Sequence, residues 1–418
     1  MRSLAPLLFF AAFAAARAAE APLDYAALRA QVAALSEQTA PPATHAAEGF
    51  AADGRVHPLF FEGPSWKGKP TRVFAWLGVP PPTSSPAAKI PGVVLVHGGG
   101  GTAFKEWVQK WNAHGFAAIA VALEGQTDER IPGAAPGAQW QRHPHGGPAR
   151  HAIYGDSAEP LADQWMFHAV ANVVRAHALL RAPPGVDAAR IGICGISWGG
   201  IITSTVVGID QRFAFGIPIY GCGSLPHAAE QYRRALKDNT LFREVWEPLR
   251  WLPRATLPLL WLTGPRDSHF PLEAQQSSYR AAPGPRMVSA PFDMRHSHTA
   301  GWNPPDSYAF AESIVTTGRP WARELAQAWQ GGQGSADFET DRPVTAATLV
   351  VRRGAEWEQL PAALAREAGR IRVSAALTAD AEAWFFNLAA EGGLTLSSEL
   401  QAAAPPPPIG AARERAPP

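Results

Sequence analysis

Short runs of consecutive apolar residues alternate with longer amphipathic stretches from residue 91 to about residue 320. The apolar runs lie at 92–99, 116–123, 190–197, 213–221, 257–264 and 285–292. Runs that are apolar at successive positions predict strands covered on both faces, as in a parallel sheet. The stretches between them predict helices at 104–115, 161–182, 198–209, 271–282 and 305–318. This alternation predicts an α/β domain with a mostly parallel sheet flanked by helices.

Other patterns precede and interrupt this core. Residues 23–38 have helical periodicity, and "HPLFFEG" and "TRVFAWLGVP" flank turn residues as a β-hairpin does. Residues 124–160 form a long loop rich in Gly, Pro and His, which predicts a functional or disordered segment. Residues 223–256 are an insertion that predicts irregular helices.

Beyond about residue 335 the pattern predicts strands without helices. The segments "AATLVVRR", "RIRVSAAL", "AWFFNLAA" and "GLTLSSEL" alternate or run apolar between turn signals. We therefore expect an α/β domain over residues 19–330 and a small β-sandwich-like domain over 331–402. The Pro-rich tail 403–418 predicts an unfolded segment.

The N-terminus has the features of a signal peptide. Arg2 precedes an apolar stretch from Leu4 to Ala16, and Ala16-Arg17-Ala18 is an Ala-x-Ala cleavage site, so residues 1–18 predict export to the periplasm or the medium. No other segment approaches about 20 continuous apolar residues, so we expect no permanent membrane span. With 37 Lys and Arg against 36 Asp and Glu and no basic run, nucleic acid is not an expected partner.

The sequence predicts no metal site and no cofactor. The stretch "HPHGGPARH" has no carboxylate or cysteine at a metal-ligand spacing, and no dinucleotide or phosphate-loop motif is present. Cys194 and Cys222 each end a strand-like run. They predict either one disulfide, if the two strands are neighbours, or two small buried thiols. The sequence leaves the oligomeric state open.

Ser197 is the predicted nucleophile. The segment "GISWG" fits G-x-S-x-G between an apolar strand and an apolar helix, a sharp turn that lifts the serine oxygen above the sheet edge. The N-terminus of the following helix points at the site and favours the negative charge of a tetrahedral intermediate.

A serine nucleophile needs a base and an acid that orients it. In this fold the order along the chain is Ser, Asp or Glu, then His, each at a strand's carboxyl end. Asp267 follows the strand-like run that ends at Gly264, whereas Asp293 precedes the histidines too closely and predicts a turn residue. His296 and His298 follow the last run, and His296, with Ser297 after it, fits the base better. His298 is the alternative base or a pocket residue.

The sequence "HGGGG", from His97 to Gly101, closes the first parallel strand. Successive glycines free backbone N–H groups to bind an oxyanion, and the Trp198 amide is the other expected donor. Gly100 and Gly101 are the expected donors in the loop, although the sequence does not decide among residues 99–101.

Several of these segments together resemble a known family. "GGGGTAF", "DQWMFHAVANVVRAHALLR", "IGICGISWGG", "FAFGIPIYGCG", "GPRDSHFP" and "RHSHTAGW" are similar to the acetyl xylan esterase and dienelactone hydrolase-like branch of the α/β-hydrolases, over residues 55–320. "WFFNLAAEGGLTLSSEL" resembles the small β-sandwich of secreted members. The resemblance implies Ser197 as nucleophile, Asp267 as acid and His296 as base; a dienelactone hydrolase proper has cysteine where Ser197 stands.

The sequence therefore predicts a secreted serine esterase that acts on small-molecule or polysaccharide esters, such as acetylated xylan, without a cofactor. Two alternatives remain open at this point. An exported peptidase of the prolyl oligopeptidase type shares the sheet and the triad, but only about 70 residues separate the signal from the first parallel strand. A catalytically silent carbohydrate-binding protein is the other alternative.

Overall fold

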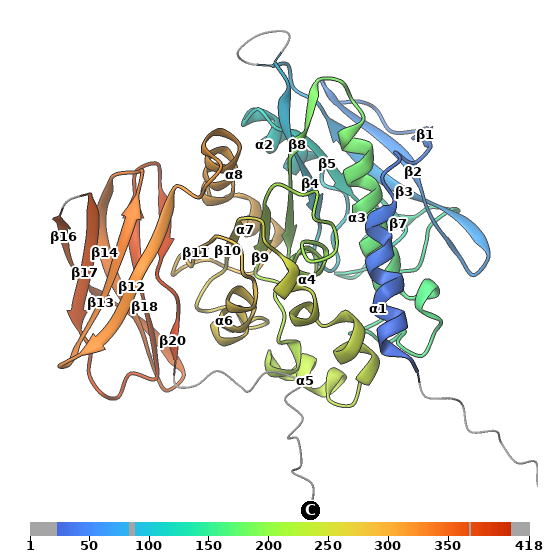
Figure 1. The fold of residues 1–418 in the computed structure, drawn as a ribbon. Coiled ribbons are helices and arrows are strands. Elements are labelled where there is room, and N and C mark those ends of the chain that lie inside the picture. The colour runs from blue at the N-terminus through green and yellow to red at the C-terminus, as the bar shows by residue number, and fades with distance from the viewer. Residues whose placement is uncertain (1–22, 83–87, 368, 403–418) are drawn as a thin grey trace, which may run out of the picture.

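The computed structural model describes residues 23–82, 88–367 and 369–402. The expected signal peptide and the Pro-rich tail lie outside the described residues. A central sheet runs through the molecule and continues into the C-terminal strands (Figure 1). Its strand order is β1-β2-β3-β5-β4-β8-β9-β10-β11-β19-β18-β14-β15.

The parallel part of this sheet holds six strands in the order β5-β4-β8-β9-β10-β11. These strands are Ile90–Val96 (β4), Ala117–Val121 (β5), Val186–Ile196 (β8), Gly216–Ile219 (β9), Leu259–Leu262 (β10) and Arg286–Ser289 (β11). They coincide with the six apolar runs. Every residue of β5, β9 and β10 is buried, because helices cover both faces of the sheet.

The flanking helices form two packed pairs. The helix α3 (Trp165–Arg181) packs against α4 (Trp198–Val206), and the helix α2 (Lys105–Ala113) packs against α8 (Asp306–Thr317), where the Trp111 and Tyr308 rings lie 4.7 Å apart. A further helix, α6 (Leu272–Ala281), follows β10. The fold is the α/β-hydrolase fold that the alternation of strands and helices predicts.

An N-terminal helix and hairpin extend the sheet. The helix α1 (Tyr25–Ala33) is capped by Asp24, whose carboxylate accepts hydrogen bonds from two backbone N–H groups of the first turn. The strand β1 (Thr44–Ala46) pairs with β2 (Val56–Trp66), which forms an antiparallel hairpin with β3 (Lys69–Gly78). β3 then pairs with β5 and joins the hairpin to the parallel strands.

The two interruptions contain more structure than the pattern suggests. Residues 124–160 include a two-stranded sheet of β6 (Gln126–Arg130) and β7 (Trp140–Arg142), and a short 3-10 helix, η2 (Leu161–Asp163), follows. The expectation of a plain loop is therefore corrected. The insertion holds α5 (Glu230–Leu236) and short turns of 3-10 or π geometry, as expected: η3 (Leu225–His227), η4 (Phe242–Trp246), η5 (Pro248–Arg250) and η6 (Leu252–Arg254).

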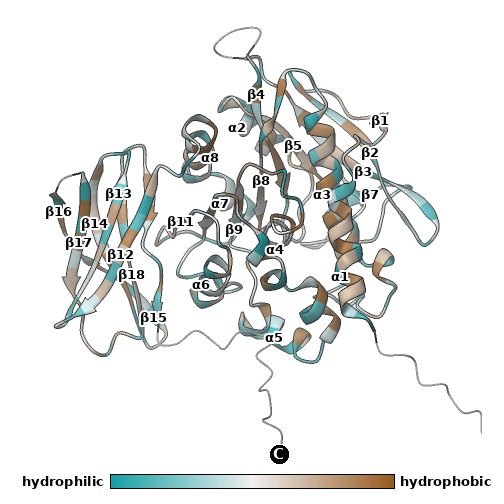
Figure 2. Cartoon of the chain, viewed as in Figure 1, coloured by the Kyte–Doolittle hydropathy of each residue, from teal (hydrophilic) through white to brown (hydrophobic). Residues whose placement is uncertain are grey.

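The C-terminal strands form two facing sheets. One has the order β12-β13-β17-β16, and the other is the end of the central sheet, in which β19 pairs with β11 at Ser397 and Val288. The strands are Ala322–Gln330 (β12), Gln333–Thr340 (β13), Val344–Arg353 (β14), Glu356–Pro361 (β15), Ala363–Glu367 (β16), Arg370–Ala376 (β17), Ala383–Ala390 (β18), Leu394–Ser397 (β19) and Gln401–Ala402 (β20). Buried positions alternate with more exposed ones along β13, which is the pattern of a sheet with one buried face, and Figure 2 shows hydrophobic and hydrophilic residues interspersed in these sheets.

The expected boundary at residue 330 needs correction. β12 ends at Gln330 and pairs with β13 along its whole length, so the C-terminal β unit begins at Ala322. The sequence of β12 gave no strand signal, because its outer half, from Ala326 onward, is mostly exposed and carries little apolar alternation.

Candidate active site

Ser197 stands at the turn between β8 and α4. Its backbone has φ 58° and ψ −115°, a conformation that costs energy for a residue with a side chain and that persists only where the surroundings enforce it. The close approach of α4 to β4 enforces the turn: a Cβ on Gly199 would lie 2.0 Å from the Val96 carbonyl oxygen. Ser197 itself is only half-buried, whereas Trp198 and Ile196 beside it are buried.

His296 joins Ser197 to Asp267. The Ser197 hydroxyl lies 2.9 Å from His296 Nε2, and His296 Nδ1 lies 2.7 Å from Asp267 Oδ2. The Asp267 side chain is 1% exposed and that of His296 21%. The other oxygen of Asp267 accepts the backbone N–H groups of His269 and Phe270 at 2.7 and 2.9 Å. A carboxylate held in this way favours the imidazole tautomer with Nδ1 protonated, which leaves Nε2 as a hydrogen-bond acceptor for the Ser197 hydroxyl.

The loop from His97 to Gly101 faces this triad, and most of its polar groups already have partners. The Gly98 carbonyl accepts from His97 Nδ1 at 2.7 Å and from the Gly101 N–H at 3.0 Å. The Gly98 N–H donates to His298 Nε2 at 3.0 Å. Among the described residues, the N–H groups of Gly99 and Gly100 have no acceptor. The expectation that Gly101 donates to an oxyanion is therefore corrected, because the Gly98 carbonyl occupies its N–H.

Side chains of the 124–160 segment hold the same loop from outside. Gln139 Nε2 and Trp140 Nε1 donate to the Gly100 carbonyl at 2.6 and 2.9 Å, and Gln126 Nε2 donates to the Gly101 carbonyl at 2.9 Å. The carbonyls of Gly100 and Gly101 therefore accept hydrogen bonds from side chains of this segment. Two uncommitted amides remain, at Gly99 and Gly100, in addition to the first amide of α4 at Trp198.

Comparisons with known proteins place the chain in a family. The family model described as Acetyl xylan esterase (AXE1) matches residues 19–246, more than half of the chain. The chain belongs to the acetyl xylan esterase (AXE1) family. It is a serine hydrolase of carboxylic esters.

Two solved structures share the fold of this esterase. The acetyl xylan esterase from Paenibacillus sp. R4 has a TM-score of 0.51 and 20% identity, over 66% of this chain and 90% of that chain. Acetyl xylan esterase 1 from Thermoanaerobacterium sp. JW/SL YS485 has a TM-score of 0.50 and 15% identity, over 66% of this chain and 89% of that one. Among curated protein sequences, none matches the chain significantly.

His298 has a different environment from His296 in the esterase. Its Nε2 faces the Gly98 amide instead of Ser197, and its ring packs 4.9 Å from that of Phe104. Burial lowers the pKa of His298 to about 4, so the ring is neutral and its Nε2 can accept the Gly98 N–H. The geometry thus separates two histidines that the sequence left as alternatives.

Aromatic rings pack against His296 and Trp198. The His296 ring contacts Tyr220 at 4.6 Å between centroids, and the Tyr220 hydroxyl donates to the Arg295 carbonyl at 2.7 Å. The Trp198 ring contacts Tyr154 and Trp165, both at 5.6 Å. Sequence reasoning did not single out Tyr154 or Tyr220, because an aromatic residue at the end of a strand or in a loop has no distinctive spacing.

The remaining candidates lie apart from the triad. Asp293 is exposed and pairs with Arg266 at 3.4 Å. Cys194 and Cys222 are free and buried although β8 and β9 are neighbours, so the thiol alternative holds. Across 23–82, 88–367 and 369–402, no group of three or more His, Cys, Asp or Glu side chains is arranged to hold a metal ion. No helix in these residues is long and apolar enough to span a membrane.

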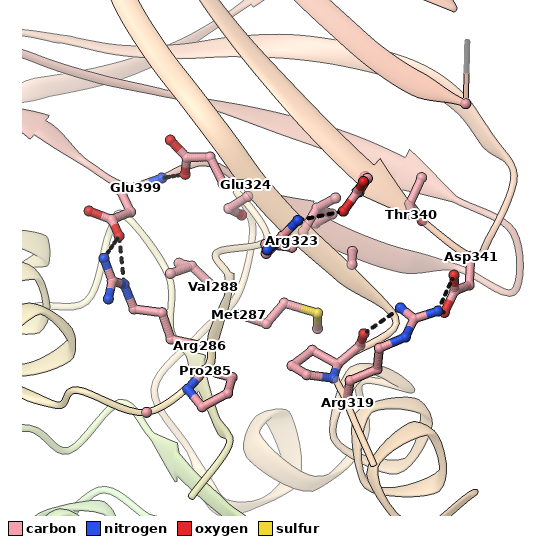
Figure 3. Close-up of a pocket in the computed structure, with 17 residues that line it drawn as sticks. Pro285, Arg286, Met287, Val288, Arg319, Arg323, Glu324, Thr340, Asp341 and Glu399 are labelled. Atoms are coloured by element: carbon pink, nitrogen blue, oxygen red, sulfur yellow. Dashed lines mark hydrogen bonds and ion pairs between the residues drawn. The ribbon is translucent and has the colours of Figure 1, made fainter. Parts of the chain in front are cut away.

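A large cavity lies away from Ser197, between β11 and the C-terminal sheets (Figure 3). Its volume is about 780 Å³. The charged side chains that line it are paired: Arg286 with Glu399, Arg323 with Glu339, and Arg319 with Asp341. The Glu399 N–H also donates to the Glu324 carboxylate, at 2.6 Å. The Arg286–Glu399 pair connects β11 to the C-terminal segment, whereas Arg323 and Glu339 both lie on C-terminal strands. None of Ser197, Asp267 and His296 lines the cavity.

Proposed function

We propose that this chain is an exported esterase that removes acetyl groups from a polysaccharide of the xylan type, with Ser197 as nucleophile, His296 as base and Asp267 as the orienting acid. The hydrogen-bonded series from Ser197 to His296 to Asp267, on an enforced turn, carries the proposal. The substrate class follows the family and the two structural relatives, which are named as acetyl xylan esterases. Export rests on the signal-peptide pattern of residues 1–18.

The reaction begins with proton transfer from Ser197 to His296. The serine Oγ attacks the ester carbonyl while His296 Nε2 takes its proton, and the buried Asp267 carboxylate stabilises the imidazolium that results. The carbonyl oxygen becomes an oxyanion. The Trp198 amide and the free amides of Gly99 and Gly100 are the donors available to hold it, because the other amides of the loop have partners.

The tetrahedral intermediate then collapses to an acetyl-enzyme, which water hydrolyses. His296 gives its proton to the departing sugar hydroxyl, which leaves an acetyl group on Ser197. Water enters, His296 takes a proton from it, and its oxygen attacks the acetyl carbonyl. The second intermediate releases acetate and returns the proton to Ser197.

Labelling and turnover together test this proposal. A fluorophosphonate probe should modify Ser197, as peptide mapping would show, and the protein should hydrolyse p-nitrophenyl acetate and release acetate from acetylated xylan. Ser197→Ala should lose both labelling and several orders of magnitude in rate. Ser277→Ala, on α6, removes a hydroxyl that donates to the Glu273 carbonyl and should change neither.

Three results would contradict the assignment. Undiminished esterase activity in the Ser197→Ala protein would remove the nucleophile. Faster hydrolysis of chromogenic peptides than of acetyl esters would favour a peptidase, and polysaccharide binding without turnover of any ester would favour a binding protein.

A further inference from the structure

Arg150, in the 124–160 segment, lies against the loop whose amides are free. Its guanidinium carbon is 4.7 Å from the centre of the Trp198 ring, and a Cβ on Gly99 would lie 3.0 Å from Arg150 Nη2. The guanidinium therefore occupies the space that a side chain at position 99 would need. It sits between the two elements that offer amides to the oxyanion, the 97–101 loop and the start of α4.

The other nitrogens of Arg150 are committed to contacts that hold the side chain in place. Nε pairs with Glu124 at 3.5 Å, and Nη1 donates to the Ala152 carbonyl at 2.8 Å. Within the part of the chain that the structure describes, Nη2 has no acceptor. The side chains of Arg150 and Glu124 are 22% and 19% exposed. Burial raises the pKa of the Glu124 carboxyl, and the Arg150 charge opposes that rise.

The backbone that carries Arg150 is also constrained. Ala152 and Tyr154 have φ of 48° and 52°, which is a strained conformation for residues with side chains. The Tyr154 carbonyl accepts from the Ser157 hydroxyl at 2.8 Å, and its ring packs against Trp198. Strain of this kind is maintained only where neighbouring contacts enforce it, and here the segment is held over Trp198.

We propose that Arg150 is a further catalytic residue of the esterase, and that its Nη2 supplies positive charge and N–H donors to the acyl oxygen of the ester as that oxygen becomes an oxyanion. The proposal rests on the proposed function of Ser197. A fixed cation beside the oxyanion stabilises the transition state more than the neutral ester, because the charge develops only there. No bond to Arg150 forms or breaks.

Three substitutions of Arg150 separate charge from packing. Arg150→Met keeps an apolar stem over Trp198, Arg150→Gln keeps donors without charge, and Arg150→Lys keeps charge without the planar fork. Arg254→Met is the matched control, since Arg254 is an exposed residue that stacks on Trp251 at 5.6 Å in the insertion. Thermal unfolding shows whether each variant is folded. If the methionine variant does not fold, the glutamine and lysine variants carry the comparison.

We expect kcat for p-nitrophenyl acetate to fall about 10- to 100-fold in Arg150→Met and Arg150→Gln, with KM changed less than about threefold. The rate of fluorophosphonate labelling should fall in parallel, and Arg150→Lys should retain an intermediate rate. A change in KM alone, or a loss confined to esters that carry a carboxylate, would overturn the proposal. Wild-type kinetics in folded Arg150 variants would also overturn the proposal, provided that Ser197→Ala is inactive. If Ser197→Ala is active, the proposed function itself fails.

Discussion

The role of His298 gives a direct test of how the site is built. Its Nε2 accepts the Gly98 N–H at 3.0 Å, and this bond orients the loop that presents the Gly99 and Gly100 amides. Glutamine places its amide oxygen near the position of Nε2, whereas asparagine is one methylene shorter. His298→Gln should therefore keep the acceptor, and His298→Asn should leave the Gly98 N–H unpaired.

The magnitude follows from what remains in the loop. An unpaired buried N–H costs about 1–3 kcal/mol of stability. Loss of a donor to an oxyanion lowers kcat by about 10²- to 10³-fold. Because Gln126, Gln139 and Trp140 still hold the loop, we expect His298→Asn to lose less, about 10- to 100-fold in kcat. His298→Gln should stay within about fivefold of wild type, as the retained acceptor implies.

The assay is p-nitrophenyl acetate turnover with thermal unfolding measured in parallel, and His296→Ala is the reference. Removing a triad base costs about 10⁴- to 10⁶-fold. If His298→Asn lost as much as His296→Ala while it stayed folded, His298 would be the base and this reading of the two histidines would be refuted. Equal rates in His298→Asn and wild type would show that the loop is positioned without the imidazole.

Three further predictions concern stability and reactivity. Gly199→Ala should unfold or lose more than about 4 kcal/mol of stability, because its Cβ would meet a backbone oxygen at 2.0 Å; thermal unfolding at the wild-type temperature would contradict this. Burial lowers the pKa of His97 and His298 to about 3 and about 4, so between about pH 6.5 and pH 4 only the unfolded chain takes up these protons. These two imidazoles should therefore contribute a loss of stability with falling pH, of up to about 1.4 kcal/mol per pH unit each. Urea unfolding should depend less on pH between pH 7 and pH 5 in His298→Gln than in the wild-type protein, and an unchanged pH dependence would argue against this reasoning. Burial raises the pKa of the free thiols of Cys194 and Cys222, so a thiol reagent should react with them only in denaturant; fast reaction of the native protein would show that they are accessible.

Much of the fold could be predicted from the chain alone. The six parallel strands coincide with six apolar runs, because a strand covered on both faces must be apolar at nearly every position. The strand β12 could not be found in this way, since its side chains beyond Ala326 are mostly exposed. The strands β6 and β7 were missed because they are short and carry polar residues, among them Gln126, which donates to the 97–101 loop.

Part of the candidate site could also be predicted from the sequence. Three signals are local: the G-x-S-x-G turn after an apolar strand, and the acid and the histidine that each follow a later strand. They point to one site because parallel strands bring their carboxyl ends to one edge of the sheet. The choice between His296 and His298 is not local: the two residues are separated by one position, and only the tertiary structure decides which imidazole meets Ser197 and which meets Gly98.

The sequence by itself determined the six parallel strands, the helices between them and the serine turn, because backbone sterics and burial act on neighbouring residues. It also supplied the residue types of the candidate triad. Only the tertiary structure decided which amides of the glycine loop are free and where Arg150 lies. Hydrogen bonds from Gln126, Gln139, Trp140 and His298 settle the first point, and packing over Trp198 settles the second. These contacts join segments that are far apart in the chain, and no local pattern specifies such pairs.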